Sequence, residues 1–112
     1  MNKKLRSEWE DFGLLSNTSD ERKDDLCELL NLSIDYVINH KYVGITETLF
    51  IPIIVRIYNI IDIKFNDVIE IILELEEQYN KFFLSNKNPN ADQELDFCTC
   101  YSEKYVENKL RI

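Results

Sequence analysis

Turn-forming residues are scarce in this chain, and their scarcity limits what it can fold into. Only two glycines, Gly13 and Gly44, and two prolines, Pro52 and Pro89, occur among 112 residues. β-Sandwiches and barrels need turn residues about every 8–12 positions, which this chain cannot supply. Because 45% of the residues are apolar and 12% are aromatic, the chain also lies outside the disordered class. We therefore expect an all-α fold: one compact domain, residues 1–112, formed by a bundle of about five helices with a central Ile-rich helix.

The apolar segment 46–62 is the candidate for that central helix. Its stripe at i, i+3, i+4, i+7, i+8 and i+11 comprises Phe50, Ile53, Ile54, Ile57, Tyr58 and Ile61, and its opposite side carries Ile51, Val55 and Ile60. The many β-branched residues also permit a buried strand, although Pro52 would break an interior strand. A helix tolerates this proline in its first turn or as a kink, so we favour the helix.

Four further segments have the apolar spacing of amphipathic helices. Their expected inward residues are Leu5, Trp9 and Phe12 in 3–12; Leu26, Leu29, Leu30, Ser33, Ile34 and Val37 in 20–39; Val68, Ile69, Ile72, Leu75, Tyr79, Phe82 and Phe83 after Asn66; and Leu95, Cys98, Tyr101, Tyr105 and Val106 after Asn90. Gly13 is expected to end the first helix, and Thr18-Ser19-Asp20-Glu21 fits a capping box for the second. Asn66 and Asn90 are expected to cap the fourth and fifth.

Charge excludes several classes of partner. Thirteen basic and 21 acidic residues give a net charge of −8, which argues against binding nucleic acid through its phosphates and against an anionic membrane surface. The most apolar window, 49–63, carries Arg56 and Asp62 and is too short to span a bilayer. The basic start of the chain lacks the apolar stretch of a signal peptide, and its three cysteines are an odd number. We expect a soluble, cytoplasmic protein with free thiols.

Residues with catalytic or metal-binding chemistry are few. His40 is the single histidine, and beside a predicted helix end it is better explained as a cation near the helix dipole than as a general base. Cys98 and Cys100 are separated by one residue, whereas structural zinc sites use C-x₂₋₄-C spacing and four ligands. No phosphate-binding loop or nucleophile elbow is present. We therefore expect no enzyme activity, no metal and no cofactor.

Acidic residues gather in two helical stripes. Asp20, Asp24 and Glu28 lie at i, i+4 and i+8, flanked by Glu21 and Asp25. Such a stripe either serves solubility and the helix dipole or forms a docking surface for a basic protein, which gains association rate from charge steering. In the second interpretation Tyr36 or Tyr42 supplies an apolar anchor. The alternative acidic stripe is Glu70, Glu74 and Glu77, which a solvated outer face also explains, with Lys81 paired to Glu77.

These observations favour a small binding protein that is monomeric alone and neutralises a basic protein, such as a toxin or nuclease domain. In size, charge and helix content the chain resembles bacterial immunity proteins, which block nuclease toxins by covering their positive substrate-binding cleft with carboxylates. The resemblance implies that Asp20, Glu21, Asp24, Asp25 and Glu28 stand in for phosphates or cover a basic rim. A phage or other viral protein is the alternative, either a structural or assembly factor or a DNA mimic directed against host defence. An enzyme would need His40 or a cysteine to be placed beside a carboxylate by the tertiary structure.

Overall fold

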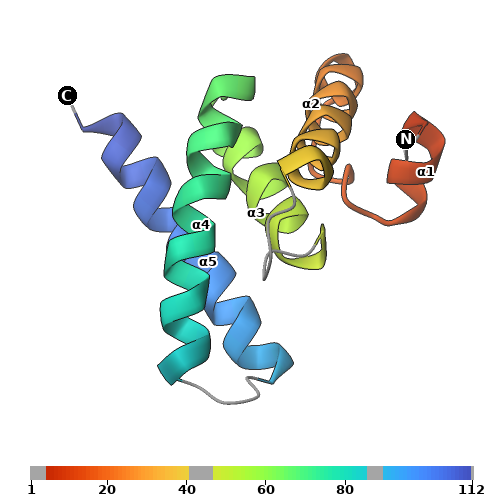
Figure 1. Ribbon diagram of the computed structural model, residues 1–112. Coiled ribbons are helices and arrows are strands. Elements are labelled where there is room, and N and C mark those ends of the chain that lie inside the picture. The colour runs from red at the N-terminus through yellow and green to blue at the C-terminus, as the bar shows by residue number, and fades with distance from the viewer. Residues whose placement is uncertain (1–4, 41–46, 86–89, 112) are drawn as a thin grey trace.

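The structure is all-α, as the scarcity of turn residues predicted. The computed structural model describes residues 5–40, 47–85 and 90–111, apart from the side chains of residues 40, 47–49, 83 and 91. Within these residues the chain forms five helices and no strand (Figure 1). They are α1 (Arg6–Asp11), α2 (Asp20–His40), α3 (Glu47–Ile60), α4 (Phe65–Ser85) and α5 (Ala91–Leu110). The radius of gyration, 13.9 Å, is close to the ~13 Å of a compact domain of this length.

Helix α3 is the centre of the bundle. It packs against α2, α4 and α5, and Figure 1 shows it between α2 and α4. Its fully buried residues are Phe50, Ile53, Ile54 and Ile57, and Ile51, Val55 and Tyr58 on its other sides are also buried. The helix interpretation of this segment is therefore confirmed, with Pro52 inside the helix. Ile60 is exposed, because it is the last residue of the helix and no neighbour covers it.

Two of the predicted helix ends are confirmed. Gly13 follows the C-cap of α1 with φ of +73°, a backbone conformation that glycine adopts without strain. Asn90 caps α5: its Oδ1 accepts from the Gln93 amide at 2.8 Å, and the Gln93 side chain accepts from the Asn90 amide at 2.9 Å. This reciprocal pair is a capping box.

The other two predicted caps are wrong. The Ser19 carbonyl, one residue later than expected, accepts the first helical amides of α2, while the Thr18 hydroxyl donates to Asn59 of α3 at 2.8 Å. Thr18 is buried, so its hydroxyl serves this tertiary contact instead of the helix end. Helix α4 begins before Asn66, because the Asp67 carboxylate accepts from the Lys64 amide at 2.9 Å and closes the first turn there.

Several predicted core positions need correction. Leu5 and Phe12 are 69% and 61% exposed, because α1 has only six residues and both lie beyond its ends; Trp9 alone of that face is buried. In α4, Ile69 is half-buried while Ile71 is fully buried, a position that the sequence analysis missed. Phe83 lies outside the described side chains. The inward face predicted for α2 is confirmed throughout.

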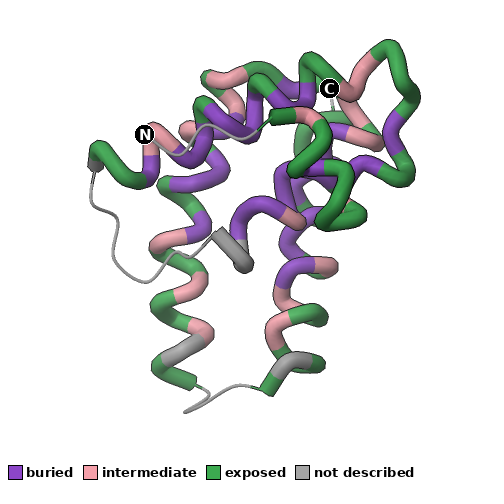
Figure 2. Tube along the Cα trace, turned by 90° about the vertical axis from the view of Figure 1, so that its right-hand side faces the viewer, coloured by how far each residue is buried: buried purple, intermediate pink, exposed green. Residues whose placement is uncertain are grey.

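The end of α4 and the start of α5 form an arm that projects from the rest of the bundle (Figure 1). This arm carries mainly exposed and half-buried residues (Figure 2). Leu95 lies in this arm and is 57% exposed, contrary to its predicted inward position. Aromatic rings join the two helices there: Phe97 of α5 lies 5.8 Å from Tyr79 and 5.1 Å from Phe82, measured between ring centroids.

Candidate functional site

The five carboxylates predicted to bind a partner lie on the first half of α2, and all are exposed. Asp20, Glu21, Asp24, Asp25 and Glu28 form what we call the α2 acidic face. The helix brings them together as the spacing predicted. What sequence reasoning did not reveal is that three of them are bound within the protein, each to a side chain from another part of the fold or from the same helix.

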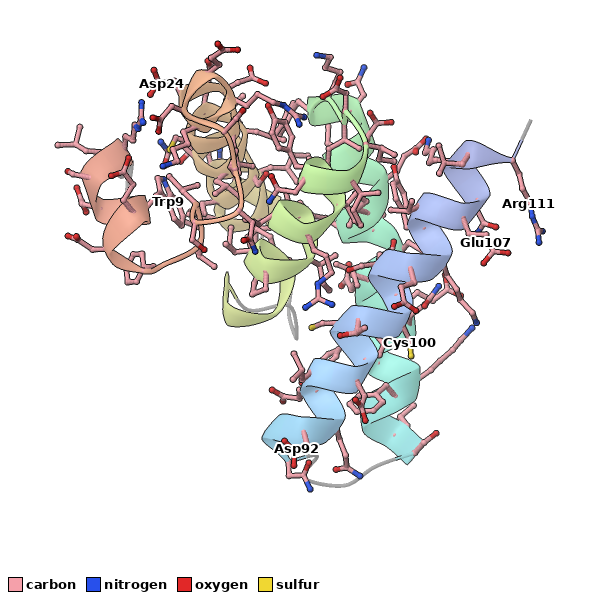
Figure 3. The ribbon with its side chains drawn as sticks, turned by 180° about the vertical axis from the view of Figure 1, so that it is seen from behind. Trp9, Asp24, Asp92, Cys100, Glu107 and Arg111 are labelled. Carbon is pink, nitrogen blue, oxygen red and sulfur yellow. The ribbon has the colours of Figure 1, made fainter. Side chains whose placement is uncertain are left out.

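Arg6 of α1 links two of these carboxylates to its own helix. Its guanidinium donates to Glu10 at 2.7 Å, to Asp24 at 3.1 Å and to Asp20 at 3.2 Å. These hydrogen bonds raise the pKa of Arg6. Lys23 also lies 3.1 Å from Asp20 and, together with Arg6, holds the pKa of that carboxyl below its ordinary value. Figure 3 shows Asp24 above Trp9 at this junction between α1 and α2.

Asp25 is bound to the central helix. Its carboxylate accepts from the hydroxyl of Tyr58 at 2.8 Å, and burial, with this hydrogen bond, raises the pKa of the Tyr58 phenol. Arg22 lies over the same ring at 4.4 Å, donates to the Tyr58 carbonyl at 3.2 Å and pairs with Asp62. Asp25 therefore holds α2 to α3.

Of the two tyrosines predicted as anchors, Tyr36 does not extend this face. Tyr36 is half-buried, about two turns beyond Glu28, and its ring meets Phe65 edge-on at 6.1 Å. Tyr42 lies outside the described residues. In the part of the chain that the structure describes, Glu21 and Glu28 are the members of the face without a hydrogen bond or ion pair to another side chain, so they are the most available to a partner.

The alternative stripe on α4 is also exposed but differently bound. Glu70 pairs with Lys109 of α5 at 3.4 Å, and Glu77 pairs with Lys81 at 3.2 Å, as the spacing predicted. Glu74 accepts from the neutral amide of Gln78 at 3.0 Å. The negative charge of Glu74 is thus the one in this stripe without an adjacent cation among the described residues.

A pocket of about 390 Å³ lies beside this stripe, between α4 and α5. Its lining comprises Glu70, Glu74 and Gln78 of α4 and Tyr101, Lys104, Tyr105, Asn108 and Lys109 of α5. We call it the α4–α5 pocket. The rings of Tyr101 and Tyr105 stack at 6.3 Å with an angle of 25°, and these residues are 5% and 7% exposed.

Both phenol hydroxyls are buried in the described structure without a hydrogen bond of ordinary length, and the Glu74 carboxylate lies beside that of Tyr101 and the Lys109 ammonium beside that of Tyr105. Burial raises the pKa of each phenol, and the nearby Glu74 carboxylate raises that of Tyr101 further. The sequence analysis placed both tyrosines in the core and the glutamates on a separate stripe. Residues 70 and 74, like residues 101 and 105, are spaced i, i+4, which places each pair on one side of its helix. Only the antiparallel pairing of α4 and α5 shows that these two sides face each other.

The three cysteines, all of them in the described part of the chain, form no disulfide. Cys27 and Cys98 are buried, and burial raises the pKa of both thiols, which keeps them in the less reactive protonated form. Cys100 is exposed. Thr99, which lies between Cys98 and Cys100 in the sequence, accepts a hydrogen bond from Arg56 at 2.9 Å. Over residues 5–40, 47–85 and 90–111, no group of three or more candidate ligands is placed to hold a metal ion. The side chain of His40 lies outside the described structure.

No described helix is both long and apolar enough to cross a bilayer. The chain matches no protein-family model, no curated protein and no solved structure. Its function must therefore be inferred from its own side chains.

Proposed function

We propose that this protein binds a basic protein through the α2 acidic face and neutralises it, as an immunity protein neutralises a nuclease-type toxin. The supporting observation is the density of carboxylates on one helix: residues 20–28 carry five acidic and two basic side chains. Asp20 and Asp24 remain 82% and 78% exposed although both pair with Arg6. Their outer surfaces therefore stay available to a partner.

The Arg6 contacts also suit this role energetically. A binding surface loses less conformational entropy when its side chains are already fixed before the partner arrives. Arg6 fixes Asp20 and Asp24, while Glu21 and Glu28 remain without an ion pair among the described residues. The face thus combines held and available carboxylates. In a toxin complex these groups would occupy the positions of nucleic-acid phosphates or cover the basic rim of the cleft, inside the cytoplasm.

The experiment is capture of a partner from a lysate of the source cells, followed by an activity assay. Immobilised wild-type protein is compared with Glu21→Lys/Glu28→Lys, which reverses the two available charges and spares the carboxylates that hold the fold. Asp96→Lys/Glu103→Lys on α5 is the control, because it changes the net charge by the same amount at exposed positions elsewhere.

The proposal predicts capture of a basic protein at low salt and its release at high salt, since exposed charge pairs are screened. The α2 variant loses the partner and the control retains it. Added wild-type protein then inhibits the nuclease activity of the purified partner. Capture that is equal for both variants, or a partner whose activity is unaffected, contradicts the proposal. Recovery of only further copies of this chain or of virion components favours the viral alternative.

A further inference from the structure

A second cavity, an open groove of about 480 Å³, lies between the loop that joins α1 to α2 and one side of the central helix α3. We call it the loop–α3 groove. Its lining on α3 has the spacing of a single helix face and comprises Pro52, Val55, Arg56, Asn59 and Ile60. Helices α2, α4 and α5 pack against α3 but leave this side open, since Arg56 and Ile60 are exposed. The volume of the groove is within the range of small-ligand sites.

Arg56 gives the groove a positive charge that the fold does not compensate. It is the one charged residue among the described residues that line the groove. Carboxylates pair with the other three arginines of the chain, Arg6, Arg22 and Arg111. Arg56 instead donates to the neutral hydroxyl of Thr99 on α5 at 2.9 Å and has no ion pair among the described residues. In a chain with 21 acidic residues, this arginine is left without a carboxylate.

The uncharged polar groups of the groove present a donor rather than acceptors. Asn59 Oδ1 accepts from the Thr18 hydroxyl at 2.8 Å, so its acceptor end is engaged and its amide nitrogen is left to donate. On the loop side, the Ser16 hydroxyl donates to the Gly13 carbonyl at 3.1 Å. A ligand in this groove therefore meets a guanidinium and an amide donor, which bind acceptor oxygens and favour an anion.

The shape of the guanidinium and the apolar wall narrow the ligand further. A guanidinium has five N–H donors in one plane, so the bond to Thr99 leaves others that match a carboxylate through two parallel hydrogen bonds. The Thr99 bond also holds the side chain before a ligand arrives, which lowers the entropy lost on binding. Leu14, Pro52, Val55 and Ile60 line the groove beside these donors, and Ile60 is 56% exposed. An apolar ligand body would remove this surface from water.

We propose that the loop–α3 groove binds a carboxylate borne on a small apolar group. Arg56 is the residue that binds the carboxylate, and Thr99 is the residue that positions Arg56. Two sources carry this chemistry: a free organic acid and the C-terminal carboxylate of a peptide that ends in an apolar residue. The groove shares no residue with the α2 acidic face, so this inference is independent of the proposed function.

The test uses 4-methylpentanoate as the free acid and acetyl-Ala-Ala-Leu as the peptide, each compared with its uncharged amide. Binding is followed by changes in backbone amide NMR shifts during titration. We expect saturable shifts in residues 13–17 and 52–60, with each amide binding at least about tenfold more weakly than its acid, the factor that ~1.4 kcal/mol produces. Tighter binding of the peptide identifies a protein C-terminus as the source, and tighter binding of 4-methylpentanoate identifies a free acid. Inorganic phosphate, which lacks an apolar body, should bind more weakly than either.

Variants assign the two arginine contacts. Arg56→Gln should weaken the tighter-binding acid by about tenfold, whereas Arg111→Gln, the same change at an exposed arginine outside the groove, should alter its affinity by less than about twofold. Circular dichroism checks that both variants are folded. Thr99→Val should weaken the acid by about threefold in the wild-type protein and have no effect in Arg56→Gln, because it acts through the guanidinium.

Four results would overturn the assignment. They are equal binding of an acid and its amide, shifts that lie outside the groove, phosphate that binds more tightly than both acids, and undiminished binding by Arg56→Gln. A loss from Thr99→Val that is the same with and without Arg56 would show that Thr99 does not position the arginine.

Discussion

The two acidic stripes have the same helical spacing but opposite relations to the fold. On α2, Asp20, Asp24 and Asp25 are bound by Arg6 and Tyr58, so most of that face helps to hold α1 and α3 in place. On α4, Glu74 accepts a hydrogen bond from a neutral amide on its own helix and lies beside the Tyr101 phenol of α5, with no ion pair to a cation among the described residues. Spacing places carboxylates on one side of a helix, but only the tertiary contacts decide whether they serve stability or remain available.

The difference between the two stripes is tested first by replacing one carboxylate of each stripe with alanine. Asp25→Ala leaves the buried Tyr58 hydroxyl without its acceptor, which should lower the free energy of unfolding by about 1–3 kcal/mol. Glu74→Ala removes an exposed carboxylate whose hydrogen bond at 3.0 Å is to Gln78 of its own helix, and it should change the free energy of unfolding by less than ~0.5 kcal/mol. Urea denaturation followed by circular dichroism measures both. Equal losses would mean that the two stripes are not distinguished in this way.

Removing phenol hydroxyls sharpens the same contrast, with smaller effects of opposite sign. Tyr58→Phe deletes a bonded hydroxyl and should lower stability by about 1 kcal/mol. Tyr101→Phe/Tyr105→Phe deletes two unpartnered hydroxyls and should leave stability unchanged or raise it by about 1 kcal/mol. All three changes keep the aromatic rings, so packing is matched. A clear loss of stability in the double variant would show that these hydroxyls are satisfied in solution.

The pocket tyrosines should also affect stability at alkaline pH. Burial raises the pKa of both phenols in the folded state, so the unfolded chain loses these protons first, near pH 10. The stability that the neutral phenols contribute is therefore complete below about pH 10 and is lost as the pH rises further. Thermal melts from pH 8 to 11 should show a decline that is shallower in Tyr101→Phe/Tyr105→Phe. An identical decline in that variant would contradict the assignment.

Much of the fold was predictable because it follows from local patterns. The stripe from Phe50 to Tyr58 identified the central helix, and Gly13 and Asn90 marked helix ends whose bonds lie within a few residues. The predictions failed where the tertiary structure overrides the local pattern. Thr18 bonds to Asn59 instead of capping α2, and Leu95 is exposed because it lies in the projecting arm.

The candidate sites were predictable only in part, for the same reason. The carboxylates of both stripes were found from their spacing, but the partners of Asp25 and Glu70 come from α3 and α5. A single sequence does not determine which turns of α4 and α5 lie opposite each other. The pocket is a product of that pairing, so it could not be found before the structure.

Association and dissociation rates of the captured basic partner, measured at two salt concentrations, test the account most directly. The account predicts that Glu21→Lys/Glu28→Lys lowers the association rate and weakens its dependence on salt, because these residues act through their charge. An association rate that is independent of salt in the wild-type protein would contradict neutralisation through an acidic face.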